Sequence, residues 1–390
     1  MSHATENQPV PTPRPRRHKG IYDAAVIGGG LVGSAIAFGL RQHLDHVAVL
    51  DEGDVAYRAS RGNFGLVWVQ SKGMGLPAYG RWTMSSQRGW AELAARLADI
   101  TGVDVALEQR GGLHAVLSDQ EYEARMEFMT RLLSQPGMVQ YEWKMLDRKE
   151  LASLIPGIGP EVRGASWTKV DGIANPLKLL RALHTAFDRQ HIDYLPLHPV
   201  SDIMQDQDVF ELATPQGAVK ARKIVLACGL GNAVLGEKLG LTVPVRPQRG
   251  QIIVMERTKR LLDLPFSTLR QMDEGTWLIG DSQEEAGYAD GQVGLPVLAT
   301  LADRAVRTLP ALRDVRVVRS WAALRVMSQD GFPIYEQSSI HPGAFVATCH
   351  SGVTLAAAHA LRLAPMIVEG RLHDEMKDFS TRRFHVQKAA

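Results

Sequence analysis

Three glycines near the N-terminus have the spacing of a phosphate-binding turn. Gly28, Gly30 and Gly33 form the pattern G-x-G-x-x-G, and Asp51 follows about 20 residues later, the usual distance for a carboxylate that binds a ribose diol. In such a turn the glycines permit a sharp bend, a close approach to pyrophosphate and tight packing of a helix on a strand. The helix N-terminus adds unpaired N–H groups and a positive dipole end. The spacing therefore predicts a dinucleotide site, and the charge of Asp51 argues against a 2′-phosphate.

The segments around these glycines have the strand, turn, helix and strand order that such a site requires. Residues 22–27 are an apolar run, residues 34–40 are an apolar helical segment, and residues 47–50 form a second apolar run that ends at Asp51. The glycine pattern alone also occurs in ordinary loops, whereas this complete context favours a dinucleotide-binding unit. The motif does not distinguish FAD from NAD(P).

Composition excludes several classes of protein. The chain has 390 residues, enough for two domains, and its 45% apolar and 22% charged content is ordinary for a globular protein. A formal net charge of +2 gives no sign of a nucleic-acid surface. Cys228 and Cys349 have the spacing of neither a metal site nor a disulfide framework, which fits a reducing cytoplasm. Since the strand, turn and helix account for the apolar run 24–40, we expect no transmembrane segment.

The first twenty residues differ from the rest of the chain. Residues 1–20 interleave prolines with arginine, histidine and lysine, and they lack the apolar core of a signal peptide. This composition predicts a disordered basic tail. We expect the tail to be solvated; contact with a partner or an anionic surface is the alternative.

Hydrophobic periodicity places further elements along the chain. Helices are predicted at 79–101, 119–134 and 176–191, the last with Asn175 as its N-cap. Strands are expected at 103–107, 112–117, 192–196, 209–213, 223–227, 252–255, 277–280, 315–324 and 345–348, and a last helix from about 352 to 369.

Segments with the character of a dinucleotide-binding sheet occur at both ends of the chain and near residue 225. We therefore expect an α/β fold, in which a discontinuous Rossmann-type domain carries an inserted α+β substrate domain with a mixed sheet. The expected bounds are 21–100, 166–243 and 327–390 for the Rossmann-type domain, and 101–165 and 244–326 for the substrate domain.

Nine short motifs follow one another along the chain. They are Ile27–Gly33, Ala59–Gly65, Gly172–Pro176, Ile224–Gly229, Pro247–Gln251, Trp277–Gly280, Ala323–Arg325, Asp330–Ile334 and Cys349–Thr354. In this order the sequence resembles the D-amino-acid oxidase superfamily of FAD-dependent oxidoreductases, and within it the glycine oxidase and sarcosine oxidase branch. Arg58 to Lys72 and Cys349 to Thr354 also resemble the catalytic subunits of heteromeric bacterial dehydrogenases, which include opine oxidases, hydrogen cyanide synthase and D-hydroxyproline dehydrogenase.

The resemblance implies oxidation of the C–N bond of an amino acid or an N-substituted amino acid. A hydride passes from the carbon next to nitrogen to flavin N5, and the resulting imine hydrolyses in water. Opines, D-hydroxyproline, sarcosine and glycine are the expected substrate classes, and electrons are expected to reach partner subunits or an acceptor other than oxygen. A peroxide-forming amino-acid oxidase is one alternative. A flavin monooxygenase or a non-catalytic FAD-binding subunit is the alternative of another class.

The same resemblance assigns residues to FAD, which we expect to be bound non-covalently. Ser60 and Arg61 are expected at phosphate oxygens, although a solvated loop is the ordinary alternative. Ser351, at a predicted helix start, begins a segment expected to stabilise negative charge on the reduced flavin, as an oxyanion hole does; a simple helix cap is the alternative. The expected FAD contacts are Gly28, Gly30, Leu31, Val32, Gly33, Asp51, Glu52, Ser60, Arg61, Asn63, Phe64, Gly65, Cys228, Gly229, Ser351, Gly352, Val353 and Thr354.

Three further residues are candidates for the substrate side. Arg325, at the end of the predicted strand 315–324, is expected to bind the substrate carboxylate at two points, as a guanidinium can. Val326 follows it where the family frequently has proline. His350 is expected to face flavin or substrate and Tyr288 to close the pocket; ordinary structural roles are the alternatives.

The remaining expectations concern partners and surroundings. Lys72 would activate oxygen if the enzyme were an oxidase, but no motif fixes its position. No metal ligand is expected. We expect a small amino-acid or opine substrate, one or more electron-accepting partner subunits and no nucleic acid. The expected location is the cytoplasm, with contact to the inner face of the membrane through a complex as an alternative.

Overall fold

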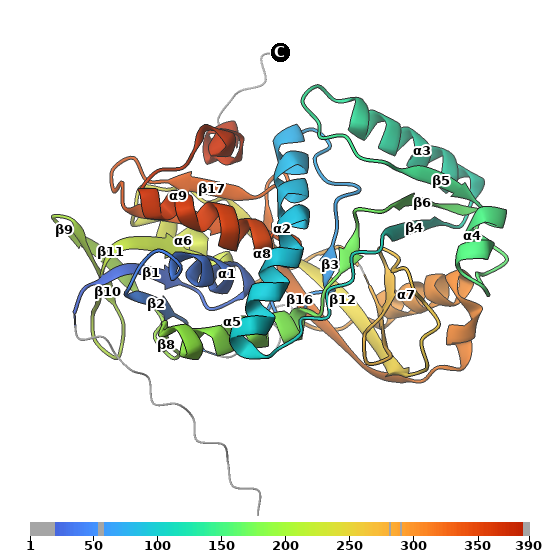
Figure 1. The fold of residues 1–390 in the computed structure, drawn as a ribbon, viewed down its shortest axis with the longest axis horizontal. Helices are drawn as coiled ribbons and strands as arrows, with labels where there is room; N and C mark the ends of the chain where they lie inside the picture. Colours follow the sequence, from blue (N-terminus) through green and yellow to red (C-terminus); the bar gives the residue numbers. More distant parts are fainter. Residues whose placement is uncertain (1–19, 54–57, 281, 289–290, 385–390) are drawn as a thin grey trace, which may run out of the picture.

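The computed structural model describes residues 20–53, 58–280, 282–288 and 291–384. Apart from Gly20, the predicted basic tail lies outside the described residues. Figure 1 shows the two halves of the molecule, with helix α2 (Pro77–Thr101) running between them.

An eight-stranded sheet gathers strands from both ends of the chain. β1 (Tyr22–Ile27) pairs in parallel with β2 (Val47–Leu50) on one side and with β11 (Val219–Leu226) on the other. β8 (Asp193–Leu195) extends the sheet beyond β2, and β18 (Ala344–Thr348) extends it beyond β11, both in parallel. Antiparallel strands β9 (Asp202–Asp206), β10 (Val209–Ala213) and β17 (Ile334–Gln337) complete it. This sheet confirms the predicted α/β, Rossmann-type fold.

At the central strand β1 both faces of this sheet are buried, and residues 24–27 are apolar without alternation. Ala24 and Val26 belong to a core with helix α1 (Leu31–Leu40), whereas Ala25 and Ile27 belong to a core on the opposite face. Such continuous apolar runs are typical of parallel strands that helices cover on both sides. The other helices of this half are α5 (Pro176–Gln190), α6 (Asn232–Glu237), α8 (Ala356–Ala358) and α9 (Ala364–Glu369).

A second, antiparallel sheet has a different origin in the sequence. Its longest strand, β12 (Val245–Arg257), pairs with β16 (Val317–Ser328), β14 (Thr276–Ile279) and β15 (Glu284–Glu285). β13 (Leu269–Gln271) continues the sheet beyond β14. The predicted strand 315–324 was therefore too short, and Arg325 lies inside β16 instead of after it.

The remaining elements lie beside this sheet. Helix α7 (Leu295–Thr308) contributes apolar side chains to the core on one face of β12. A three-stranded sheet has β6 (Gly164–Thr168) between β4 (Gly112–Val116) and β5 (Lys144–Asp147). Short strands β3 (Leu66–Val67) and β7 (Gly172–Ile173), helices α3 (Asp119–Ser134) and α4 (Arg148–Leu154), and 3-10 turns at Gly229–Gly231, Pro310–Asp314, Asp374–Phe379 and Thr381–Phe384 complete the described elements.

Two further sequence-based expectations about elements were wrong. Residues 103–107 form no strand: the carbonyl of Val105 accepts from the amide of Asn175, and the next contact is an isolated bridge between Glu108 and Ile173 of β7. The last helix does not start at Gly352: residues 352–355 are turns, α8 begins at Ala356, and a π-helical segment, His359–Leu363, separates α8 from α9. In contrast, the Asn175 cap of α5 is confirmed, since its side chain accepts hydrogen bonds from the amides of Leu177 and Lys178.

Candidate functional site

The glycine turn is packed too tightly for any side chain. Gly28 has φ +113°, and a Cβ on it would lie 2.4 Å from the carbonyl oxygen of Ala227. A Cβ on Gly33 would lie 1.9 Å from the carbonyl oxygen of Gly28. α1 therefore begins directly above the turn. Among the described residues, the amides of Val32 and Gly33 have no hydrogen-bond partner, which leaves two N–H groups for a phosphate.

Asp51 closes the turn from the end of β2. Its Oδ2 accepts from the amide of Gly29 at 2.7 Å, and its Oδ1 accepts from that of Gly53 at 2.9 Å. Both oxygens keep lone pairs that a ribose diol could use. The neighbouring Glu52 points elsewhere and forms an ion pair with Arg58 at 2.6 Å, with its side chain 59% exposed.

The loop after Asp51 returns to the start of α1. Because several of its residues are predicted to contact FAD, we call residues 58–66 the flavin loop. The hydroxyl of Ser60 accepts from the amide of Leu31 at 2.9 Å and lies against Gly30, where a Cβ would meet it at 2.7 Å. Ser60 thus caps the N-terminus of α1, because Gly30 at the N-cap position has no side chain that could do so. Arg61 follows in the same loop and is exposed, so its contact with a phosphate stays a prediction.

Farther along, the flavin loop meets the antiparallel sheet. Asn63 Oδ1 accepts from the amide of Gly65 at 2.7 Å, which closes a tight turn. Phe64 packs among apolar residues of β12 and β14. The buried Arg270 donates to the carbonyls of Gly65 and Ala174, both at 3.1 Å, while its Nε has no partner within the described residues. Burial lowers the pKa of Arg270 to about 9.

Cys228 and Gly229 follow the end of β11, beside the glycine turn. The thiol of Cys228 contacts Asn232 Oδ1 at 2.9 Å, and burial raises its pKa to about 12. Gly229 has φ +64° and lies against Val326 of β16. Val326 is buried and continues β16, where it pairs with Pro247 of β12.

The segment after β18 is tied to α2 and to the flavin loop. Thr354 donates from its hydroxyl to the carbonyl of Leu66 at 2.8 Å. Its own carbonyl accepts from Ser86 at 2.7 Å and from Trp90 at 3.2 Å, both on α2. Gly352 turns above α1, where Leu31 and Val32 are the nearest neighbours of a Cβ on Gly352. The two expected FAD segments, at 28–33 and 351–354, are therefore brought together.

Lys72 and His350 form a polar cluster at the start of this segment. Lys72 Nζ donates to Ser351 Oγ at 3.1 Å and lies 3.4 Å from His350 Nε2. The hydroxyl of Tyr79 is 2.9 Å from Ser351 Oγ. Burial, with the Lys72 and Arg325 cations, holds the pKa of His350 well below its usual range, so the imidazole is neutral. Burial also raises the pKa of the Cys349 thiol to about 12.

The loop that carries Lys72 is fixed from the other half of the molecule. The buried carboxylate of Asp171 accepts from the amides of Val69 and Gln70, at 2.5 and 3.2 Å. Arg125 of α3 donates to Gln70 Oε1 at 2.7 Å. Because Asp171 is fully buried, its pKa rises to about 7. Lys72 therefore has a position that no local sequence pattern indicates.

Arg325 faces the flavin loop because of strand alternation. Trp321 and Ala323 share its face of β16, and Gly62 of the loop packs on Ala323, where a Cβ would lie 2.3 Å from it. Gln248 of β12 is the direct cross-strand partner of Arg325 and so lies on the same face. Gln248 is 8% exposed, and its side chain has no hydrogen bond within the described residues. Arg325 donates to the carbonyl of Ser282 at 2.7 Å.

Tyr288 is the candidate that the structure leaves apart. Its side chain is 64% exposed, and its hydroxyl donates to the carbonyl of Val245 at 3.3 Å. No contact within the described residues joins it to Arg325 or His350, so closure of a pocket by Tyr288 stays a prediction. Nor do the described residues contain a group of three or more side chains arranged to hold a metal ion.

Sequence reasoning missed three residues of this region. Gln248 lies inside the recognised segment 247–251. Once β12 and β16 were paired, the register would have shown that Gln248 lies opposite Arg325, on the same face of the sheet. Tyr79 and Arg270 had no such signal, since only the tertiary fold brings them to Ser351 and Gly65.

The fold and these contacts define a class of protein. The chain superposes on glycine oxidase from Geobacillus kaustophilus with a TM-score of 0.84 and 25% identity, covering 92% of this chain and 98% of that one. The glycine turn, the paired Asp51 and the open amides of Val32 and Gly33 fit the pyrophosphate and ribose of FAD. The class is thus an FAD-dependent oxidoreductase.

Sequence comparisons then identify the family. The model of the D-amino-acid oxidase (DAO) family, described as FAD dependent oxidoreductase, matches residues 23–366, and the chain belongs to this family. It is 44% identical to an opine oxidase subunit of Agrobacterium tumefaciens (strain Ach5) over 94% of this chain and 99% of that protein. It is 42% identical to the corresponding opine oxidase subunit of Rhizobium meliloti, with the same coverage. Hydrogen cyanide synthase subunit HcnC of Pseudomonas aeruginosa is 27% identical over 95% of this chain and 98% of that protein.

These findings confirm the predicted family resemblance, the cofactor FAD and the class of enzyme. They leave the choice between dehydrogenase and oxidase open. No helix among the described residues combines the length and apolar character needed to cross a bilayer.

Proposed function

We propose that this enzyme oxidises the C–N bond of an N-substituted amino acid of the opine class and passes the electrons to a partner subunit. The observation that carries the proposal is the pair of Arg325 and Gln248 on the face of the antiparallel sheet that meets the flavin loop. A guanidinium and an amide that has no hydrogen bond among the described residues form a strip that suits a carboxylate next to an amine. The 44% identical relative bears the name opine oxidase, which favours an opine over glycine.

We assign distinct tasks to the residues around this strip. Arg325 binds the carboxylate, and Gln248 accepts from the amine N–H through its Oε1, which orients the nitrogen. When bound, FAD supplies the acceptor for the hydride that leaves the carbon next to nitrogen. Neutral His350 accepts a hydrogen bond without adding positive charge, while Lys72 supplies the cation beside Ser351.

Non-covalent FAD is part of the proposal. Both cysteine thiols have pKa values raised to about 12 by burial, so neither is a nucleophilic thiolate near neutral pH. We further propose that the Rossmann-type sheet belongs to an FAD-binding domain with bounds 21–100, 166–243 and 327–390, and that 101–165 and 244–326 form the substrate domain.

The direct test is anaerobic bleaching of the flavin by a panel of octopine, nopaline, D-hydroxyproline, D-proline, sarcosine and glycine. We expect the opines to bleach it fastest. Dye reduction much faster than hydrogen peroxide formation would support the dehydrogenase; equal rates would contradict it.

Arg325→Met tests the carboxylate contact. Losing a desolvated charge pair costs about 2–5 kcal/mol, so kcat/KM for the preferred amine should fall roughly 30- to 5,000-fold with FAD content unchanged. Arg319→Met is the matched control, because Arg319 lies on the same face of β16 but is exposed. Unchanged turnover in Arg325→Met would sink the assignment.

A further inference from the structure

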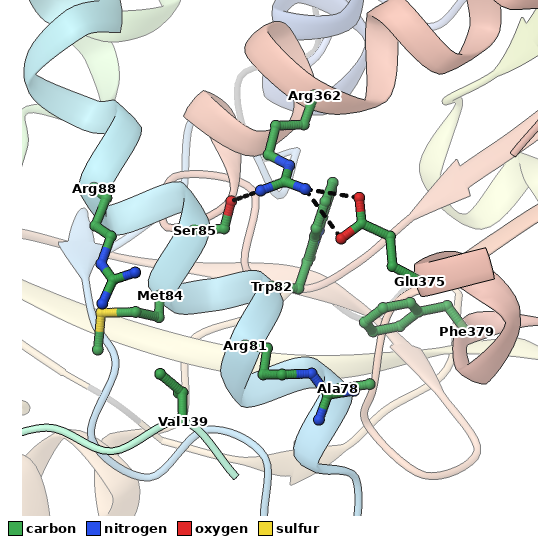
Figure 2. Close-up of a pocket in the computed structure, with 10 residues that line it drawn as sticks. All are labelled: Ala78, Arg81, Trp82, Met84, Ser85, Arg88, Val139, Arg362, Glu375 and Phe379. Carbon is green, nitrogen blue, oxygen red and sulfur yellow. Dashed lines mark hydrogen bonds and ion pairs between the residues drawn. The ribbon is translucent and has the colours of Figure 1, made fainter. Parts of the chain in front are cut away.

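A pocket opens on one side of α2, and Figure 2 shows the residues that line it. Its volume is about 330 Å³. Six of its lining residues follow one helical stripe of α2, and the others come from the loop after α3 and from the C-terminal segment. The lining residues are Ala78, Arg81, Trp82, Met84, Ser85, Arg88, Val139, Arg362, Glu375 and Phe379.

Positive charge dominates the rim of this pocket. Arg362 donates to Ser85 at 2.9 Å and to both oxygens of Glu375 at 2.8 and 3.0 Å, which compensates one guanidinium (Figure 2). Arg81 donates only to the neutral carbonyl of Gly137, and Arg88 has no partner within the described residues. In the part of the chain that the structure describes, these two guanidinium groups on one stripe therefore have no carboxylate partner.

The floor of the pocket is apolar and rigid. Trp82, Met84 and Phe379 line the pocket, and each of these residues is at most 3% exposed. The Trp82 and Phe379 rings pack at a centroid distance of 6.4 Å, and Trp82 Nε1 donates to the hydroxyl of Tyr335 at 3.1 Å. A cationic rim over an aromatic floor suits an acidic polypeptide segment with one apolar side chain.

The opposite stripe of the same helix holds residues 351–354, the segment that is predicted to contact FAD. Tyr79 contacts Ser351, and Ser86 and Trp90 both donate to the carbonyl of Thr354. α2 therefore has one stripe on the pocket and one on the segment assigned to FAD. A polypeptide seated in the pocket would be separated from that segment by one helix.

We propose that this pocket is the docking site for an acidic segment of the electron-accepting partner subunit. The inference rests on the proposed function, which includes such a partner. Charge complementarity decides the occupant: two uncompensated arginines attract carboxylates, and the aromatic floor accepts an apolar anchor. That the similar opine oxidase and HcnC chains are named as subunits supports a protein occupant over a free anion.

The test uses the complex isolated through a tag on the full chain from its source cells, with subunits identified by mass spectrometry. Arg81→Lys and Arg88→Lys keep the charge and introduce amines that a carbodiimide couples only to adjacent carboxylates. We expect both variants to cross-link to Asp or Glu of one partner subunit. Arg96→Lys, an exposed position on the same helix, should not.

A second pair of variants measures the contribution of charge. Arg81→Glu with Arg88→Glu should reduce recovery of that subunit about tenfold or more, whereas Arg96→Glu should leave it unchanged. Amine-driven bleaching of the flavin should persist in all variants; its failure in the wild-type chain would instead contradict the proposed function.

Three outcomes would overturn the docking site. In the first, the Arg81→Glu, Arg88→Glu chain assembles normally with the partner subunit. In the second, the lysine variants cross-link only to a second copy of this chain. In the third, the Arg81→Glu, Arg88→Glu chain loses binding to phosphatidylglycerol vesicles while its complex stays intact.

Discussion

The two ends of the candidate FAD site are built in opposite ways. At the pyrophosphate end, the glycine turn and Asp51 lie within one stretch of chain, and the contacts are made mainly by backbone amides. At the working end, Lys72, Gln248, Arg325 and His350 come from four distant segments, and the contacts are made by side chains. The first end depends on the absence of side chains, and the second depends on their tertiary placement.

This difference separates binding from chemistry. Changes at the pyrophosphate end should alter how much FAD the protein holds, because they change the shape of the cradle. Changes at the working end should alter the rate of flavin reduction at constant FAD content. Four experiments test that separation.

The largest effect is expected for Gly33→Ala. The new Cβ would lie 1.9 Å from the carbonyl oxygen of Gly28, so α1 must move off the turn. Overpacking of this kind costs about 3 kcal/mol or more, and we expect FAD content below about a tenth of the wild-type value. Absorbance of purified protein near 450 nm measures it. Gly287→Ala is the control, since nothing lies within 4 Å of its Cβ; full FAD content in Gly33→Ala would break the comparison.

Lys72→Met should have the next largest effect. It removes the cation that contacts Ser351 and His350, while its methylene stem is kept. Loss of one fixed donor at a charged site costs roughly 10²-fold in rate. Stopped-flow reduction by the preferred amine should slow by that order with FAD content unchanged. A normal rate with reduced FAD content would place Lys72 at the binding end instead.

The pH dependence should change in the same variant. Burial is the main cause of the lowered pKa of His350 and the Lys72 cation adds to it, so removing Lys72 should raise that pKa toward the ordinary histidine range. Since a lowered pKa keeps the imidazole neutral in acid, the acid limb of kcat/KM should move to higher pH in Lys72→Met. When the pH profiles of the wild-type chain and Lys72→Met are compared for the same substrate, the ionisation of the amine substrate contributes equally to both. Superimposable acid limbs would show that His350 does not limit the reaction.

The smallest effect is expected for Asp51→Asn. The amide keeps the size of the side chain but loses the charge and one of the two acceptors for the amides of Gly29 and Gly53. A charge-assisted hydrogen bond contributes about 1.5–3 kcal/mol, of which asparagine retains a part, so FAD affinity should fall about tenfold. The reduction rate of FAD-loaded protein should not change. Fluorescence titration of apoprotein with FAD measures the affinity.

How far the sequence predicted this molecule follows the same division. Gly28 to Asp51 was predictable because a turn, a helix start and a carboxylate recur at fixed spacing in one segment. Arg325 was assigned through the family motif, yet its strand was predicted to end too early, because Val326 to Ser328 carry no mark that distinguishes strand from loop. Lys72 could not be placed at all, since a carboxylate and an arginine about 50 to 100 residues away fix its loop.

The hold of Asp171 and Arg125 on the Lys72 loop has a consequence for recombination among relatives. Lys72 belongs in sequence to the N-terminal segment, but its coordinates are set by β6, α3 and the turn that carries Asp171. A chimera that exchanges residues 1–100 alone would carry the lysine without the side chains that aim it. To keep the position of Lys72, residues 69–171 must therefore be exchanged together. Chimeras with crossovers inside that span should fold and bind flavin, but Lys72 should lose its position beside Ser351 and His350.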